Sequence, residues 1–198
     1  MLKIELLKSP HSFHSNSYLI SSKGEYAVID PTAPYNPTLI DGEVKYILLT
    51  HAHFDHILEI DSWVDNTNAE VIVCSYEQDA LSDPMRNCYK LYDGSDQGYF
   101  GESRGINEGD SIPLGDQMIE IIYTPGHTIG SVCYKIGSDV FVGDTVFAGG
   151  GYGRFDLPTG NITMLRDSIR KILALPDEFV LYPGHGESTT SKEYKSFY

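Results

Sequence analysis

Side chains able to bind metal ions are concentrated in one short stretch of the chain. Residues 50–56 read THAHFDH and so contain His51, His53, Asp55 and His56. The apolar run before them predicts a strand, and side chains two residues apart on an extended chain point to the same side, so His51 and His53 can reach one ion. Asp55 and His56 follow where the strand pattern stops, and a turn there can direct them to a second ion. The spacing therefore predicts a site for two metal ions.

Three further candidate ligands follow predicted strands later in the chain. His127, Asp144 and His185 each come directly after a glycine that closes an apolar or β-branched run. Strand ends that meet at one edge of a layered sheet gather binding groups from distant parts of a sequence. Each of these motifs alone is also typical of an ordinary turn or helix cap. Clustered imidazoles, however, would cost on the order of several kcal/mol to bury without partners, so the whole set indicates metal binding.

The donor types narrow the choice of metal. Nitrogen and carboxylate ligands without thiolate suit zinc, iron or manganese, and geometry matters more than raw affinity in selecting among them. We expect two divalent ions, zinc in the first place and iron or manganese as alternatives. The chain contains no His-Glu-x-x-His motif, which excludes a helical zinc-protease site of that type.

The elements that must position these side chains fall into two sets of strands with helices between them. Alternating or β-branched runs closed by turn residues predict strands at 2–7, 17–20, 26–29, 46–50, 70–74, 111–114, 118–123, 132–136, 140–142 and 179–182. Helical patterns cover 57–66, 75–81 and 162–175, the last with Asn161 as N-cap and Pro176 as stop. This arrangement favours an α/β layered architecture with two sheets face to face and helices outside.

One connection, residues 83–105, has no clear periodicity. It is rich in glycine and tyrosine and carries several basic residues. A connection of this length is often functional, for example as a lid or a binding loop. An ordered surface excursion or a tyrosine-rich dimer contact is the alternative interpretation.

Composition limits the organisation and the partners. With 198 residues, of which 41% are hydrophobic, we expect one domain spanning residues 1–198. The formal net charge of −14 stays strongly negative even with two divalent ions bound. Such a surface repels phosphate backbones and anionic lipids, so we expect no nucleic-acid or membrane partner and a small-molecule substrate instead.

Several features favour a cytoplasmic protein. Residues 1–7 carry charges among apolar side chains and no small-residue cleavage site follows them, so they predict a strand rather than a signal peptide. No stretch approaches the roughly 18 apolar residues that cross a bilayer. Cys74, Cys88 and Cys133 form no closely spaced pair, which is typical of a reducing compartment and not of a disulfide framework or a zinc ribbon. The oligomeric state is not predicted.

These motifs resemble those of the metallo-β-lactamase superfamily and, within it, the group similar to glyoxalase II (hydroxyacylglutathione hydrolase). The resemblance rests on residues 50–56, 124–131, 141–147 and 182–186 and spans nearly the whole chain. It implies an αββα sandwich, two mixed sheets with helices on the outer faces, and a site on one edge. It also implies a ligand set in which the first ion is held by His51, His53 and His127, the second by Asp55, His56 and His185, and both by a bridging Asp144.

The same resemblance bears on the substrate. Arg154 matches a basic position that contacts the substrate in the glyoxalase II group, although a salt bridge to Asp156 is an equal alternative. Asp156 stands where that group tends to place a tyrosine, and residues 57–60 replace the usual small glycine-rich residues. Glyoxalase II enzymes also carry a C-terminal helical domain that supplies much of the glutathione site, and here 13 residues follow His185. We therefore expect a short, single-domain member of the group.

The expected reaction is hydrolysis. Two ions about 3.5–4 Å apart can share a water and lower its pKa toward about 7, which supplies a metal-bridging hydroxide at neutral pH. Asp55 is expected to orient this hydroxide and to handle its proton. A thiolate, with a free pKa of about 8.5, leaves without a strong general acid, whereas an amide nitrogen needs protonation. Thioesters are therefore the expected substrates, followed by lactones and other activated esters.

Two alternatives remain at this level. Persulfide dioxygenases share these motifs but use one iron, bound by residues that match His51, His127 and Asp144. The chain could also be a non-catalytic metal-binding module in which residues 83–105 recruit a partner.

Overall fold

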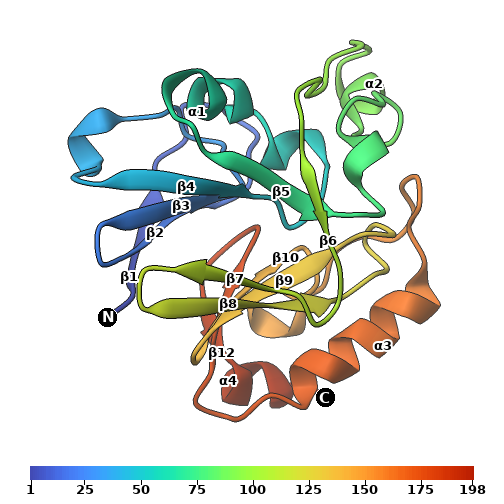
Figure 1. Ribbon diagram of the computed structural model, residues 1–198. Coiled ribbons are helices and arrows are strands. Elements are labelled where there is room, and N and C mark those ends of the chain that lie inside the picture. Colours follow the sequence, from blue (N-terminus) through green and yellow to red (C-terminus); the bar gives the residue numbers. More distant parts are fainter.

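Two six-stranded sheets pack face to face in the computed structural model, which describes residues 1–198 (Figure 1). The first sheet has the order β1-β2-β3-β4-β5-β6 and the second the order β12-β11-β10-β9-β8-β7. Both sheets are mixed, because β3 to β6 pair in parallel in the first and β10 pairs in parallel with β11 in the second. Figure 1 shows α1 and α2 over the first sheet and α3 and α4 below the second. The predicted αββα sandwich is confirmed.

The element bounds follow the sequence patterns closely. The first sheet consists of β1 (Lys3–Leu7), β2 (Ser17–Ser22), β3 (Glu25–Ile29), β4 (Glu43–Leu48), β5 (Glu70–Cys74) and β6 (Arg104–Ile106). The second consists of β7 (Ser111–Leu114), β8 (Gln117–Tyr123), β9 (Val132–Ile136), β10 (Asp139–Gly143), β11 (Val180–Pro183) and β12 (Thr189–Thr190). The helices are α1 (Ile60–Asn66), α2 (Tyr89–Tyr92), α3 (Ile162–Leu173) and α4 (Ser191–Lys195).

Three hydrophobic layers result from the alternation of side chains along the strands. In β4, Leu48 lies in the central core between the sheets, whereas its neighbour Ile47 packs in the outer core that contains Trp63 of α1. In β10, Phe141 faces the central core and Val142 packs in the outer core under α3 and α4. Each sheet is thus covered on both faces, which holds its edges, and the loops that leave them, in fixed positions.

Helix α3 is built as the sequence predicts. The Asn161 side chain caps it by accepting hydrogen bonds from the backbone N–H groups of Thr163 and Met164. Leu165 and Ile169 lie on the buried face, against the second sheet. The helix ends at Leu173, before Pro176.

Two helix predictions differ from the structure. The predicted helix 75–81 is wrong, because this segment forms a turn followed by a short 3-10 helix, Gln78–Ala80. Its first backbone N–H, that of Ser75, bonds to the carbonyl of Ile106 in β6 and so continues the sheet. The predicted helix 57–66 begins only at Ile60, after a 3-10 helix, Phe54–His56, that belongs to the ligand motif.

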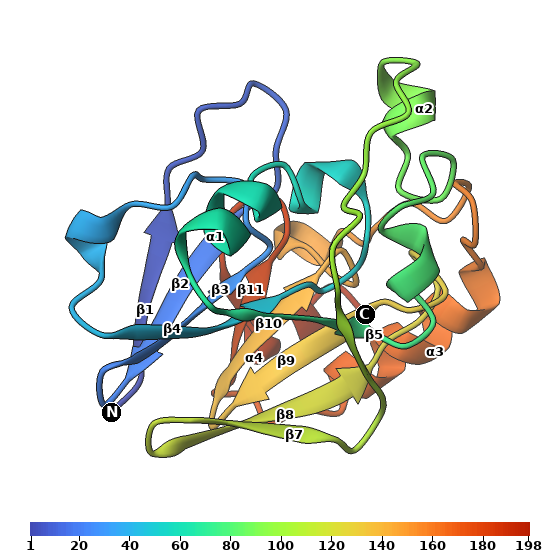
Figure 2. The same ribbon diagram turned by 45° about the horizontal axis from the view of Figure 1, so that its top comes forward.

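The connection 83–105 contains α2 and the start of β6, neither of which the sequence predicted. In Figure 2 this segment stands at the upper end of the molecule, as does the loop between β1 and β2. The short elements β12 and α4 near the C-terminus were also not predicted. All four elements have at most five residues, too few for a periodic pattern to be recognised.

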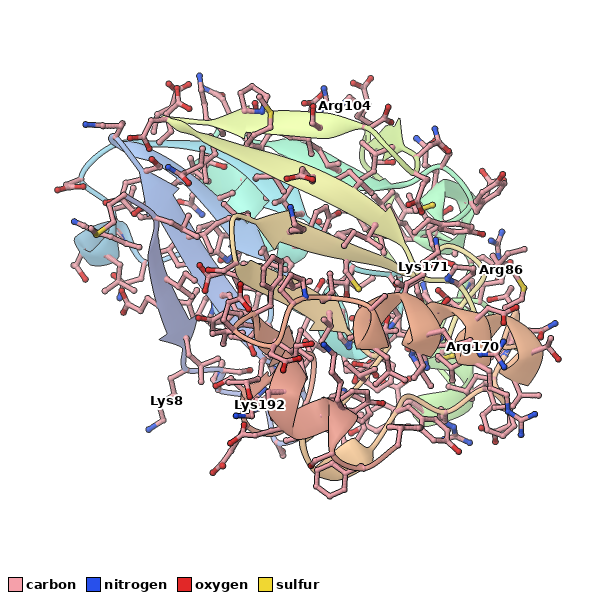
Figure 3. The ribbon with its side chains drawn as sticks, turned by 90° about the horizontal axis from the view of Figure 1, so that it is seen from below. Lys8, Arg86, Arg104, Arg170, Lys171 and Lys192 are labelled. Atoms are coloured by element: carbon pink, nitrogen blue, oxygen red, sulfur yellow. The ribbon has the colours of Figure 1, made fainter.

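Basic side chains are spread over the surface. Figure 3 shows Arg170 and Lys171 on α3, well apart from Lys8 and from Arg104. Several of these cations pair with local acids, as Arg170 does with Asp167 at 2.6 Å. None of the helices combines the length and the apolar character that a bilayer crossing requires.

Candidate metal centre

The seven candidate ligands converge at one edge of the sandwich. Asp144 directly follows β10, His185 follows β11, and His127 lies in the turn between β8 and β9. Gly126 and Gly143, which precede two of these ligands, have φ angles of 135° and 48°, a backbone region that favours glycine. Three groups of ligand atoms lie within 4.8 Å of one another: His51, His53 and His127; His51, His56 and Asp144; and Asp55, His56 and His185.

Three imidazoles form the first group. His127 Nε2 lies 3.2 Å from His51 Nε2 and 2.9 Å from His53 Nδ1. The three side chains are buried, and their ring planes are nearly perpendicular to one another. Their nitrogens therefore point at a common position.

Hydrogen bonds on the far side of two rings determine which nitrogen carries the proton. His127 Nδ1 lies 2.6 Å from the Arg154 carbonyl oxygen, so Nδ1–H donates and Nε2 keeps a lone pair. His51 Nδ1 faces the Thr50 hydroxyl at 3.1 Å, and that hydroxyl donates its hydrogen to Asp30. His51 Nδ1–H is thus also a donor. Two lone pairs then face each other across 3.2 Å, an arrangement that a bound cation stabilises.

Asp144 lies between the two sets of histidines. Its Oδ1 is 3.4 Å from His56 Nε2, and its Oδ2 is 3.5 Å from His127 Nε2 and 3.6 Å from His185 Nε2. Asp55 Oδ2 in turn lies 3.2 Å from His185 Nε2. One carboxylate therefore borders both candidate ion positions.

Three buried polar atoms of the candidate ligands lack a hydrogen-bond partner, which bears on whether these residues fit a metal. His53 Nε2, His56 Nε2 and Asp144 Oδ1 are buried and form no hydrogen bond. Unsatisfied buried groups are costly, by about 1–3 kcal/mol each, and coordination by Asp144 and His56 removes that cost. The imidazole and carboxylate donors, together with the buried atoms that lack hydrogen-bond partners, therefore fit a metal centre.

The charge states of His51, His53 and Asp144 suit cations, whereas His56 holds a proton that a bound cation would displace. Burial lowers the pKa of His51 well below its ordinary value, and burial also lowers the pKa of His53 to about 3, so both rings stay neutral. For His56, burial opposes the charged form, but Asp30 and Asp144 outweigh it and raise the pKa. Burial likewise opposes ionisation of Asp144, but the adjacent His56 outweighs it, so the pKa of this carboxyl is lowered. Asp144 is therefore an ionised carboxylate among imidazoles.

Sequence reasoning missed two buried carboxylates that hold the ligand loops. Asp30, just after β3, accepts hydrogen bonds from His56 Nδ1 at 2.8 Å and from the Thr50 backbone and hydroxyl. Glu77 accepts from the N–H groups of Ala52 and Gly130. The only feature of the sequence that could have indicated the role of Asp30 is its position at the end of a strand beside β4. Glu77 fell inside the wrongly predicted helix 75–81.

A cavity of about 470 Å³ opens beside the cluster. Arg154 lines this cavity, and its guanidinium also donates two hydrogen bonds to Asp156, at 2.8 and 2.6 Å. The salt bridge considered from the sequence is therefore present. The connection 83–105 contributes Cys88, Leu91 and Tyr92 to the cavity wall. This part of the connection thus borders the candidate site.

Comparison with known proteins identifies the family. The model of the metallo-beta-lactamase superfamily matches residues 12–185. Together with the sandwich and the histidine and aspartate cluster, this match shows that the chain belongs to the metallo-beta-lactamase superfamily, a superfamily of metal-dependent hydrolases.

Individual members are similar over nearly their full length. The chain is 32% identical to the probable metallo-hydrolase MJ0888 of Methanocaldococcus jannaschii, covering 89% of this chain and 90% of the relative. It matches the crystal structure of the BLEG-1 B3 metallo-beta-lactamase with a TM-score of 0.86 and 29% identity, over 99% and 97% of the two chains. The structure of TTHA1623 in a di-iron-bound form gives a TM-score of 0.79 and 26% identity, over 96% of each chain.

Proposed function

We propose that this chain is a dinuclear metallo-hydrolase of thioesters, similar in activity to glyoxalase II. Lactones and other activated esters are the next candidates. The observation that carries the proposal is the convergence of seven donors with Asp144 between two groups of imidazoles. In the proposed ligand set, His51, His53 and His127 would hold one ion, Asp55, His56 and His185 would hold the second, and Asp144 would contribute to both.

The proposed metals are two divalent ions. Nitrogen and carboxylate donors favour zinc, with iron or manganese as alternatives. The di-iron form of the relative TTHA1623 supports iron as the first alternative. When bound, such a pair lowers the pKa of a shared water and polarises a substrate carbonyl.

The side chains supply orientation and proton transfer. Asp55 is buried and lines the cavity, and its Oδ2 is fixed near His185 Nε2. Its carboxylate is proposed to hold the attacking water in position and to accept its proton. Asp30 and the Arg154 carbonyl orient the His56 and His127 rings from behind. Arg154 itself, at the cavity wall, is the proposed substrate contact.

The nature of the leaving group follows from the cavity wall. Every histidine and carboxylate that lines the cavity belongs to the proposed ligand set. Apart from the proton that Asp55 accepts from the water, the ligand set leaves no imidazole or carboxylic acid there to protonate an amine as it leaves. A thiolate departs without such help, because its conjugate acid has a pKa of only about 8.5. This favours thioesters over amides.

The test combines metal analysis with a substrate panel. The purified protein is loaded separately with zinc, iron and manganese, its metal content is measured, and thiol release is followed from S-D-lactoylglutathione and simpler thioesters. We expect two ions per chain and hydrolysis of at least one thioester. One iron per chain with oxygen uptake on glutathione persulfide would instead identify a dioxygenase. Two bound ions without turnover of any thioester, lactone or ester would refute the hydrolase proposal.

A further inference from the structure

Three aromatic rings from three separate segments form one wall of the cavity. Phe13 comes from the loop between β1 and β2, Phe54 from the ligand motif and Tyr92 from the end of α2. The rings of Phe13 and Phe54 are 5.8 Å apart and inclined by 14°, those of Phe13 and Tyr92 are 5.5 Å apart and inclined by 25°, and those of Phe54 and Tyr92 are 4.4 Å apart. Figure 2 shows the loop before β2 and the α2 segment at the same end of the molecule.

This aromatic wall reaches the candidate metal ligands. The Phe13 ring lies 6.5 Å from the His185 ring, and Phe147 lies 6.0 Å from the same ring. Phe13 is 52% exposed and Tyr92 57% exposed, so large apolar surfaces stay open to solvent directly beside the reaction site. Exposed apolar surface of this kind, gathered at a cavity, is typical of a ligand-binding wall.

The side chains of the cavity wall disfavour acyl groups that carry a carboxylate. Arg154 is the only Lys or Arg side chain that lines the cavity. Its guanidinium is already engaged by both oxygens of Asp156. An anionic substrate tail would compete with that carboxylate, and the chain as a whole carries a net charge of −14. Apart from the metal ions themselves, the cavity wall therefore offers no free cation to a carboxylate on the acyl group.

From these observations we infer that the pocket selects thioesters whose acyl group is neutral and apolar, and that the aromatic wall of Phe13, Phe54 and Tyr92 binds that group. The inference rests on the proposed hydrolase function and specifies its substrate class. A cavity of about 470 Å³ accommodates an acyl group the size of a branched chain or a single ring beside the carbonyl.

The experiment keeps the leaving group constant and varies the acyl group. N-acetylcysteamine thioesters of acetate, 3-methylbutanoate, phenylacetate and glutarate are compared by kcat/KM on the metal-loaded protein. Because each added methylene in an apolar pocket improves kcat/KM by roughly 10-fold or more, phenylacetyl and 3-methylbutanoyl should exceed acetyl by at least that factor. Glutaryl, which carries a carboxylate, should fall below both. Equal values for all four thioesters, or a higher value for acetyl or glutaryl than for the two apolar acyl groups, would overturn the inference.

Substitutions in the aromatic wall test whether it causes the preference for apolar acyl groups. Phe13→Ala and Tyr92→Ala should each lower the phenylacetyl-to-acetyl ratio of kcat/KM by roughly 5-fold or more, since each removes one stacked ring. Tyr92→Phe keeps the ring and should keep the ratio. Phe100→Ala is the matched control, because Phe100 is an exposed aromatic residue of the same 83–105 connection that does not line this cavity. An unchanged ratio in both alanine variants would contradict the assignment.

A binding measurement separates this inference from the proposed reaction. N-(2-acetamidoethyl)phenylacetamide, the analogue in which an amide NH replaces the thioester sulfur and which carries no free thiol, is titrated calorimetrically into the metal-loaded protein. If the amide binds the wild type and binds Phe13→Ala several-fold more weakly, the apolar pocket is supported. If no thioester is hydrolysed in that case, only the hydrolase proposal fails. Hydrolysis of all acyl groups at equal rates, with no measurable binding of the amide, would refute the pocket inference alone.

Discussion

The Glu77 carboxylate accepts a hydrogen bond from the Gly130 backbone N–H at 2.9 Å and thereby joins two loops that carry candidate metal ligands. Its other oxygen accepts from the N–H of Ala52, which lies between His51 and His53. A carboxylate is suited to this position because both of its oxygens accept hydrogen bonds. The relative position of the two loops therefore depends on a side chain that touches no candidate ligand atom.

Replacing Glu77 by Gln should weaken metal binding. An amide offers one acceptor and would direct its NH₂ group at the second N–H, so one buried donor loses its partner at a cost of about 1–3 kcal/mol. Displacement of supporting groups of this kind typically lowers metal affinity by roughly 10- to 100-fold. Competition with a chromophoric chelator measures the affinity, and Asp79→Asn, at an exposed acidic residue two positions away, is the control. Equal affinities in the two variants would contradict the supporting role of Glu77.

The same residue should affect how stability depends on pH. Burial raises the pKa of Glu77 above its ordinary value. A carboxyl whose pKa is higher in the folded than in the unfolded chain favours folding at low pH, and this contribution is lost as the pH rises through the raised folded value. The stability of the wild type relative to Glu77→Gln should therefore fall as the pH increases above about 4.3. Urea unfolding of both metal-free proteins tests this, and a difference that stays constant or grows with pH would count against it.

The Asp30→Asn variant should lose affinity for one ion in particular. Asp30 accepts the Nδ1–H of His56, which directs His56 Nε2 toward Asp144. An asparagine can present its NH₂ group to that nitrogen and so release the ring from this orientation. We expect the affinity for the more weakly bound of the two ions to fall by roughly 10- to 100-fold. Stepwise titration with zinc measures the two affinities separately. A uniform loss of both ions together with unfolding would show a structural role only.

The candidate ligands could be singled out from the sequence because their information is local, and the structure brings their side chains together. Four of them lie within residues 51–56, and the other three directly follow a glycine at the end of a run with strand periodicity. The long strands and α3 were predictable for a related reason, since burial on one or both faces imposes a period on the sequence. Both kinds of signal can be read without knowing the partner elements.

The parts that sequence reasoning missed depend on contacts between distant segments. Glu77 and Asp30 are ordinary acidic residues until folding places them behind the ligand loops, so no local pattern distinguishes them. The segment 75–81 has helical spacing, but bonding of Ser75 to β6 and burial of Glu77 override that propensity. The aromatic wall joins Phe13 to Tyr92, 79 positions apart, and no pattern in the sequence links them.

Two neighbouring glycines allow a test of how closely the backbone approaches the centre. A Cβ at Gly184 would collide with Asp144 Oδ1 and lie 2.7 Å from His56 Cε1, whereas a Cβ at Gly186 meets nothing within 4 Å. Gly186 has a positive φ of 81°, so Gly186→Ala costs roughly 1–2 kcal/mol of backbone strain. We expect Gly184→Ala to lose at least one ion and Gly186→Ala to keep both while losing some thermal stability. Metal analysis and thermal unfolding of the two variants check this, and full metal content in Gly184→Ala would exclude the close approach.

Removal of Asp144 should have the largest effect on the centre. Its carboxylate lies 3.4–3.6 Å from the ring nitrogens of His56, His127 and His185, and it is the negative charge that would offset repulsion between two neighbouring cations. Asp144→Ala should lose one or both ions and lower thioester hydrolysis by more than roughly 100-fold, a larger effect than loss of a supporting residue. Metal analysis and thiol release are measured on the same sample, with Asp167→Ala, an exposed acidic residue of α3, as the control. Two retained ions with normal turnover would reject the bridging role, whereas loss of one ion with turnover close to that of the wild type would mean that a single ion suffices for the reaction.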